Sequence, residues 1–155
     1  MKLSGVKITG GYVIDIVIPR QDDPIVLRAQ AIMDFDEFER LCPEPQPPIV
    51  MKPGDKIGMP KVTDQEYLKK FGEWAELRIL FMYLKSLSAT EGLEWETIKM
   101  DDPATWKNFE QELTDAGLSA YERARVYSDI AKVNCMDEDH VEAARKSFLA
   151  GAASQ

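Results

Sequence analysis

The segment from Thr63 to Leu87 places the strongest constraint on how this chain folds. Thr63 and Glu66 have the S/T-x-x-E spacing of a capping box, which predicts that a helix begins there. One face of that helix is apolar at 3.6 residues per turn: Tyr67, Leu68, Phe71, Trp74 and Ala75. The run from Ile79 to Leu84 is apolar without interruption, so it is apolar on all sides of a helix. We therefore expect a central helix whose second half is enclosed by other parts of the chain or by a partner.

Charge is unevenly distributed along the chain. The 155 residues carry a net charge of −8, with −1 in residues 1–62 and −7 in residues 63–155. Nucleic acids and anionic membranes attract clustered lysine and arginine, so the acidity argues against both as partners. The length predicts one domain with a substantial core.

The two cysteines, Cys42 and Cys135, lie too far apart in sequence to indicate a disulfide scaffold or a zinc site. The N-terminal residues lack the apolar run of a signal peptide, and no later segment is long enough to cross a bilayer. The sequence therefore predicts a cytoplasmic protein with reduced thiols.

The N-terminal residues 1–42 are expected to form a β-sheet part with a short helix. Residues 2–9 and 12–18 are typical of two strands joined at Gly10-Gly11, and Ile25 to Ile32 is typical of a third. Asp34 is a predicted cap for a helix from Phe35 to Leu41. These elements predict a small antiparallel sheet of about three strands.

Residues 43–62 are predicted to be a proline-rich extended linker, because repeated prolines prevent both helix and central strand. Residues 63–155 then form about four helices. After the central helix, further starts are predicted at Asp102-Pro103, at Ser119 with Glu122, and at Asp137, where Met136 and Val141 would pack together. The fold class is therefore α+β, a small sheet followed by a helical bundle, with residues 1–42 and 63–155 in one compact unit.

No residue pattern predicts catalysis, a metal or a cofactor. The single histidine, His140, follows Asp137, Glu138 and Asp139, and such acidic residues are expected where they favour the positive end of a helix dipole. A second acidic group comprises Asp34, Asp36, Glu37 and Glu39, which fits a solvated helix face. Phosphate-binding loops, nucleophile elbows and metalloprotease motifs are absent from the sequence.

The most informative polar positions are Arg78 and Lys85, because they interrupt the apolar arc of the central helix. The first interpretation is that Arg78 stacks over Trp74 or pairs with a carboxylate, and that both side chains extend to solvent. The second is that the arc binds a partner. Its residues would be Phe71, Trp74, Arg78, Phe81, Met82 and Lys85.

Three stretches resemble the tail assembly chaperones encoded by long-tailed bacteriophages. They are residues 85–97 (KSLSATEGLEWET), 116–119 (AGLS) and 142–149 (EAARKSFL). The resemblance implies a non-enzymatic protein of the host cytoplasm that coats the apolar, helical tape measure protein before the tail tube polymerises around it. It also implies self-association and absence from the finished virion.

Two other functions remain open from the sequence. One is a structural component of the virion, such as a tail or head–tail connector subunit, whose β-part pairs with neighbouring subunits. The other is an acidic intracellular inhibitor or adaptor that binds a basic protein in a salt-sensitive complex.

The two interpretations of the arc predict different effects of changing Arg78 and Lys85 to glutamate. A binding face predicts loss of complex formation in a pull-down with an unchanged thermal midpoint, because only the partner contact is lost. A fall in the midpoint, measured by circular dichroism, would instead assign the arc to the core.

Overall fold

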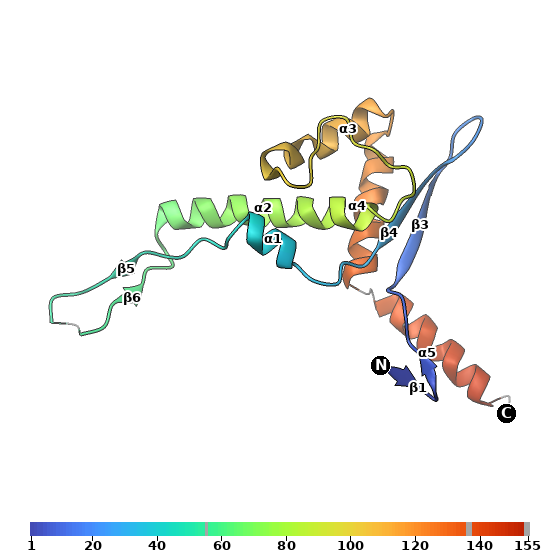
Figure 1. Cartoon of the computed structure of the whole chain (residues 1–155), viewed down its shortest axis with the longest axis horizontal. Coiled ribbons are helices and arrows are strands. Elements are labelled where there is room, and N and C mark those ends of the chain that lie inside the picture. Colours follow the sequence, from blue (N-terminus) through green and yellow to red (C-terminus); the bar gives the residue numbers. More distant parts are fainter. Residues whose placement is uncertain (55, 136–137, 154–155) are drawn as a thin grey trace. The chain divides into compact units, whose positions relative to one another are not determined.

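The computed structural model describes residues 1–54, 56–135 and 138–153, except for the side chains of residue 140 and residues 148–153 (Figure 1). The elements, in chain order, are β1 (Lys2–Leu3), β2 (Val6–Lys7), β3 (Val13–Ile18), β4 (Ile25–Gln30), α1 (Asp36–Leu41), β5 (Ile49–Val50), β6 (Met59–Pro60), α2 (Gln65–Leu87), the 3-10 helix η1 (Pro103–Asn108), α3 (Phe109–Asp115), α4 (Ala120–Cys135) and α5 (Glu138–Ala153). The predicted α+β class is confirmed, with antiparallel strand pairs early in the chain and the longer helices after them.

The chain divides into two compact units that are each built from separate segments. Unit 1 comprises Met1–Met33, Lys85–Glu94 and Leu113–Gln155, and unit 2 comprises Asp34–Leu84 and Trp95–Glu112. Helix α2 contributes residues to both units. The two units are described separately below.

Unit 1 is organised around the β3–β4 hairpin and α4, which lie side by side (Figure 1). The strands pair from Val13 opposite Gln30 to Ile18 opposite Ile25, so alternate side chains point to one face. The buried side chains of that face are Ile16, Ile18, Leu27 and Ala29, and those of α4 are Val126, Ile130 and Val133. The alternation predicted for the third strand is therefore confirmed, and the sheet buries one face.

The strand pairing predicted at Gly10-Gly11 is wrong. Residues 2–9 do not pair with residues 12–18; β1 instead folds back on β2 through Ser4 and Gly5, which both adopt positive φ. β3 pairs with β4, whose buried Leu27 and Ala29 match the alternation of β3, whereas the residues before Gly10 are exposed. Among the described residues the strands form separate two-stranded sheets rather than one sheet of three.

A buried polar group in unit 1 connects three segments of the chain. Asn134 on α4 donates to Ser86 Oγ at 2.8 Å and to the Ile130 carbonyl at 2.9 Å, and its Oδ1 accepts from Ile32 N at 3.0 Å. Ser86 is fully buried, so it needs this partner. The network joins the end of α2 and the chain after β4 to α4.

Unit 2 has an aromatic core between α1, α2 and η1. Phe38 and Phe81 lie 5.5 Å apart between ring centroids, and the Trp106 ring lies 5.6 Å from that of Phe81. All three side chains are fully buried. The indole nitrogens also have partners, since Trp106 Nε1 donates to the Lys99 carbonyl and Trp74 Nε1 to the Cys42 carbonyl.

The loop before η1 is held by Glu112. Its carboxylate accepts from the backbone N–H groups of Glu96, Thr97 and Ile98 and from the Thr97 hydroxyl, at 2.6–3.2 Å. Partial burial acts to raise the Glu112 pKa, but these hydrogen bonds outweigh it and the pKa is lowered. The irregular loop thereby satisfies its backbone donors.

Local capping signals were mostly predicted correctly. The carboxylate of Asp102, the residue before Pro103, accepts from Ala104 N. Ser119 and Glu122 form the reciprocal capping box. At α2, however, the cap is Asp64 rather than Thr63, because Tyr67 N donates to Asp64 Oδ1 at 3.0 Å. The predicted start at Asp137 and the packing of Met136 lie outside the described residues.

Glu122 also connects α4 to the turn between β3 and β4, because its carboxylate accepts from the guanidinium of Arg20 at 2.6 Å. The hydrogen bonds from Arg20 and Ser119 lower the Glu122 pKa from 4.5 to about 2. Its folded-state pKa is depressed, so its contribution to stability is present above pH 4.5 and is lost as the pH falls towards about 2.

Replacing Glu122 with glutamine should lower the thermal midpoint at neutral pH and reduce the difference in midpoint between pH 5 and pH 3. The reason is that the variant loses the negative charge that Arg20 binds, while the amide oxygen of glutamine can still accept from Ser119 N in the capping box. Thermal scans across this pH range test it, with the exposed Glu94→Gln as control. An unchanged pH dependence in Glu122→Gln would contradict the assignment.

Candidate functional site

One residue of the arc predicted to bind a partner, Phe81, belongs to the unit 2 core. Phe81 is fully buried against Phe38, Trp106 and Phe35, with the Phe35 ring centroid at 6.0 Å. It is therefore corrected from a binding residue to a core residue. The uninterrupted apolar run could not indicate this, because the sequence does not say which part of the chain covers it.

Trp74 and Arg78 adopt the geometry of the first interpretation. The Trp74 ring is half-buried between Phe38 at 5.7 Å and Phe71 at 5.4 Å. The guanidinium carbon of Arg78 lies 4.0 Å from the Phe35 ring centroid and 5.8 Å from that of Trp74. Arg78 thus stacks mainly on Phe35, a residue that the sequence analysis did not associate with it.

The remaining residues of the arc differ in exposure. Phe71, which contacts Trp74, and Met82 are half-buried, and the exposed Lys85 belongs to unit 1 whereas Arg78 belongs to unit 2. Trp74 and Arg78 do line a hollow of about 540 Å³. Its other lining residues are Glu39, Pro43, Glu44 and Gln46.

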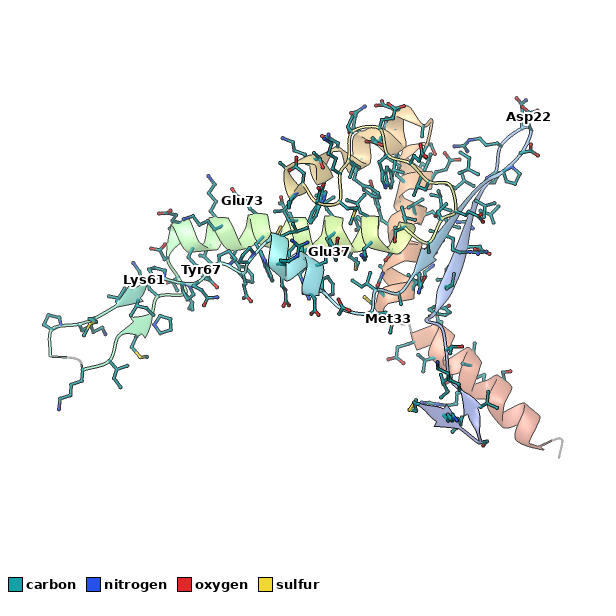
Figure 2. The ribbon with its side chains drawn as sticks, in the orientation of Figure 1. Asp22, Met33, Glu37, Lys61, Tyr67 and Glu73 are labelled. Carbon is teal, nitrogen blue, oxygen red and sulfur yellow. The ribbon has the colours of Figure 1, made fainter. Side chains whose placement is uncertain are left out.

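The exposed apolar side chains of unit 2 are concentrated instead on the β5–β6 hairpin, inside the predicted linker 43–62. We call the following six side chains, which are between 44% and 79% exposed, the hairpin surface: Ile49, Val50, Met51, Ile57, Met59 and Val62. Figure 2 shows side chains along this hairpin, with Lys61 labelled. Exposed apolar clusters of this kind mark interaction sites.

The hairpin is defined by a short ladder and a glycine. Ile49 pairs with Pro60 and Val50 with Met59, and Lys61 N donates to the Pro48 carbonyl at 2.9 Å. A Cβ at Gly58 would collide with the side chain of Ile49. Glycine therefore allows the apolar side chains of β5 to lie across the opposite strand. The linker prediction missed this pairing.

A groove of about 560 Å³ lies along one side of this hairpin. Its lining residues are Val50, Lys52, Met59, Pro60, Lys61, Val62 and Thr63. It therefore combines an apolar floor with two lysines. These side chains can bind a polypeptide segment, but no two of them form a pair suited to catalysis.

Unit 1 has its own exposed apolar residues on the β1–β2 hairpin: Met1, Leu3, Val6 and Ile8. Leu3 and Val6 lie in the two-residue strands β1 and β2, and Met1 and Ile8 flank these strands. Residues 2–9 were predicted to form one longer strand of a sheet, so this exposure was not predicted.

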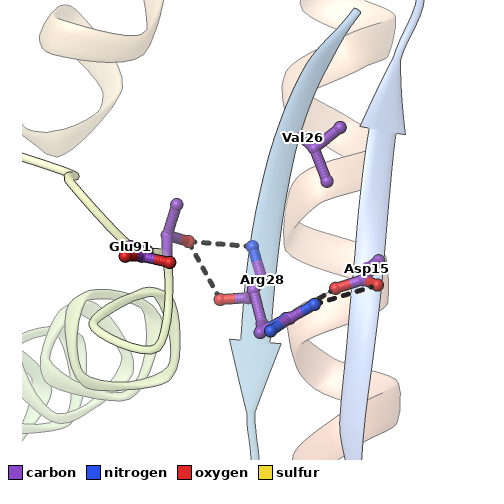
Figure 3. A pocket seen from close by; sticks show the side chains of 5 residues that line it. Asp15, Val26, Arg28 and Glu91 are labelled. Carbon is purple, nitrogen blue, oxygen red and sulfur yellow. Dashed lines mark hydrogen bonds and ion pairs between the residues drawn. The ribbon is translucent and has the colours of Figure 1, made fainter.

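A polar hollow of about 180 Å³ on unit 1 is occupied by structural contacts (Figure 3). Arg28 donates to Asp15 at 2.8 Å, which lowers the Asp15 pKa and raises that of Arg28. The Thr90 hydroxyl accepts from Arg28 N and donates to the Arg28 carbonyl, so it covers part of the free edge of β4. Glu91 and Val26 complete the lining.

The chemistry-bearing residues named from the sequence are dispersed. Within the described ranges no three His, Cys, Asp or Glu side chains form a potential metal site, and His140 lies outside the described side chains. Burial raises the pKa of the Cys42 thiol, which keeps it protonated. No helix in the described part of the chain has both the length and the apolar character required to span a bilayer.

Comparison of the chain with protein-family models, with curated proteins and with solved structures finds no match. The function is therefore argued from the hairpin surface and from the sequence resemblance.

Phe81→Ala should lower the free energy of unfolding by about 3–5 kcal/mol, because it leaves a cavity among Phe38, Trp106 and Phe35. Chemical denaturation measures this change. Leu68→Ala, at a half-exposed position on the same helix, is the control and should cost much less. Equal losses in the two variants would contradict the core assignment.

Proposed function

We propose that this protein is a non-enzymatic polypeptide-binding protein, specifically a tail assembly chaperone that binds an apolar helical partner, the tape measure protein, in the host cytoplasm. The observation that carries the proposal is the hairpin surface. Six large apolar side chains stand exposed on an element with only two residues in each strand. Their exposure to water is unfavourable until a partner covers them.

The hairpin surface suits a polypeptide better than a small molecule. Its side chains are spread along the two strands of the hairpin. The groove that they border is lined by apolar side chains, two lysines and Thr63. An amphipathic helix can place its apolar side chains against both Ile57 and Met59. Contact through one apolar face is a common mode of helix recognition.

The charge of the chain supports the same function. A protein that holds an apolar partner must keep the complex from aggregating, and a net charge of −8 provides electrostatic repulsion between complexes. The resemblance of residues 85–97, 116–119 and 142–149 supports the identity of the partner and the self-association of this protein.

A second candidate, a structural subunit of the tail or connector, is favoured by one observation. Strand β3 pairs only with β4 among the described strands, so its other edge is open to a strand of a neighbouring subunit. This candidate predicts that the protein is present in purified particles, whereas a chaperone is found in infected cells and is absent from particles.

The test of the proposed function is co-expression with the tape measure protein of the same genome. Ile57→Ser combined with Met59→Ser should reduce the recovery of soluble complex about tenfold, because the partner loses its apolar contact. The amount of partner co-purified on a tag measures the effect.

A control changes two exposed apolar side chains elsewhere in unit 2. Leu68 and Ile79 on α2 are 46% and 48% exposed, so Leu68→Ser with Ile79→Ser should leave the complex intact. The proposal fails if the control loses the partner equally or if the hairpin variant retains it. Thermal midpoints of the variants establish that both chains are folded.

A further inference from the structure

The hairpin is locally basic in an acidic chain. Residues 49–62 contain Lys52, Lys56 and Lys61 against one acidic residue, Asp55, which gives +2. Since the whole chain carries −8, the residues outside this segment carry −10. The apolar side chains of the hairpin surface are therefore accompanied by charge of the opposite sign to the rest of the protein.

Two of these lysines lie on the groove side of the hairpin. Val50 and Met59 are opposite one another in the register, and Lys52 and Lys61 follow β5 and β6, each two residues along the chain from one of them. All four of these residues line the groove of about 560 Å³.

We infer that the segment bound in this groove is an acidic amphipathic one, with apolar side chains on Val50, Met59 and Val62 and carboxylates near Lys52 and Lys61. The inference rests on the proposed function, since it assumes that the hairpin binds a polypeptide. Carboxylates on the bound segment would be attracted by the charge of +2 that residues 49–62 carry, an attraction that a purely apolar segment does not gain.

An anionic membrane offers the same charges but fits the protein less well. A bilayer presents an extended negative plane, which would repel the −10 carried by the rest of the chain. A segment with a few local carboxylates meets only the hairpin, and charges further away than the screening length of about 8 Å at physiological salt contribute little. The observations therefore favour a polypeptide.

The test uses three synthetic amphipathic peptides of about 20 residues with identical apolar positions, long enough for a measurable helix population. Their polar positions carry glutamate, glutamine or lysine. Fluorescence anisotropy at about 0.15 M salt should give a dissociation constant about tenfold lower for the glutamate peptide than for the glutamine peptide, with the lysine peptide weakest.

Charge reversal identifies the responsible side chains. The double variant Lys52→Glu/Lys61→Glu should reverse the order of the affinities for the three peptides. Lys69→Glu with Lys107→Glu makes the same change in net charge at exposed positions outside the groove and should preserve the order.

The outcomes separate this inference from the proposed function. Equal binding of the glutamate and glutamine peptides, or an unchanged order in Lys52→Glu/Lys61→Glu, overturns the inference. Loss of all peptides in Ile57→Ser/Met59→Ser would still support polypeptide binding. If no peptide binds, but phosphatidylglycerol vesicles bind in a manner that needs Lys52 and Lys61, the inference fails in favour of a membrane; co-expression then decides the proposed function.

Discussion

The packing of aromatic rings around Phe81 determines which surfaces of unit 2 remain available. Phe38 from α1 and Trp106 from η1 close on this side chain from segments far apart in sequence, and each ring adds both buried area and a favourable ring contact. Arg78 then lies over Phe35 at the margin of the cluster. The most apolar part of α2 is thereby used largely for folding, and the exposed apolar side chains of unit 2 lie mainly on the hairpin surface.

Features encoded by neighbouring residues could be predicted from the sequence. The caps at Asp102 and at Ser119 with Glu122 are local, since each joins groups a few residues apart, and the structure has them. The alternation of β4 was also predicted because it needs only one strand. The partner of residues 2–9 could not be predicted, since Gly10-Gly11 is compatible with a hairpin, whereas in the structure β1 pairs with β2 through Ser4 and Gly5 and these residues stay exposed.

The assignment of Phe81 to a binding surface was wrong for a related reason. An apolar run predicts that something covers it, and only the tertiary structure distinguishes the same chain from a partner, as at Phe81. The hairpin was missed because its prolines suggested an extended linker. A signal was nevertheless present: apolar residues from Ile49 to Met51 and from Ile57 to Met59 flank Pro53-Gly54, a turn pair, and Gly54 adopts positive φ.

The interleaving of the two units along the chain affects how this protein can be dissected. Unit 1 uses three segments and unit 2 uses two, and α2 begins in one and ends in the other. The shortest contiguous fragment that contains unit 2, residues 34–112, therefore also carries Lys85–Glu94 of unit 1, and only the whole chain contains unit 1. Because a helix melts cooperatively, loss of α2 would withdraw Phe81 from one core and Ser86 from the other in a single event. The persistence of one unit is thus tied to that of the other through the continuous backbone of α2.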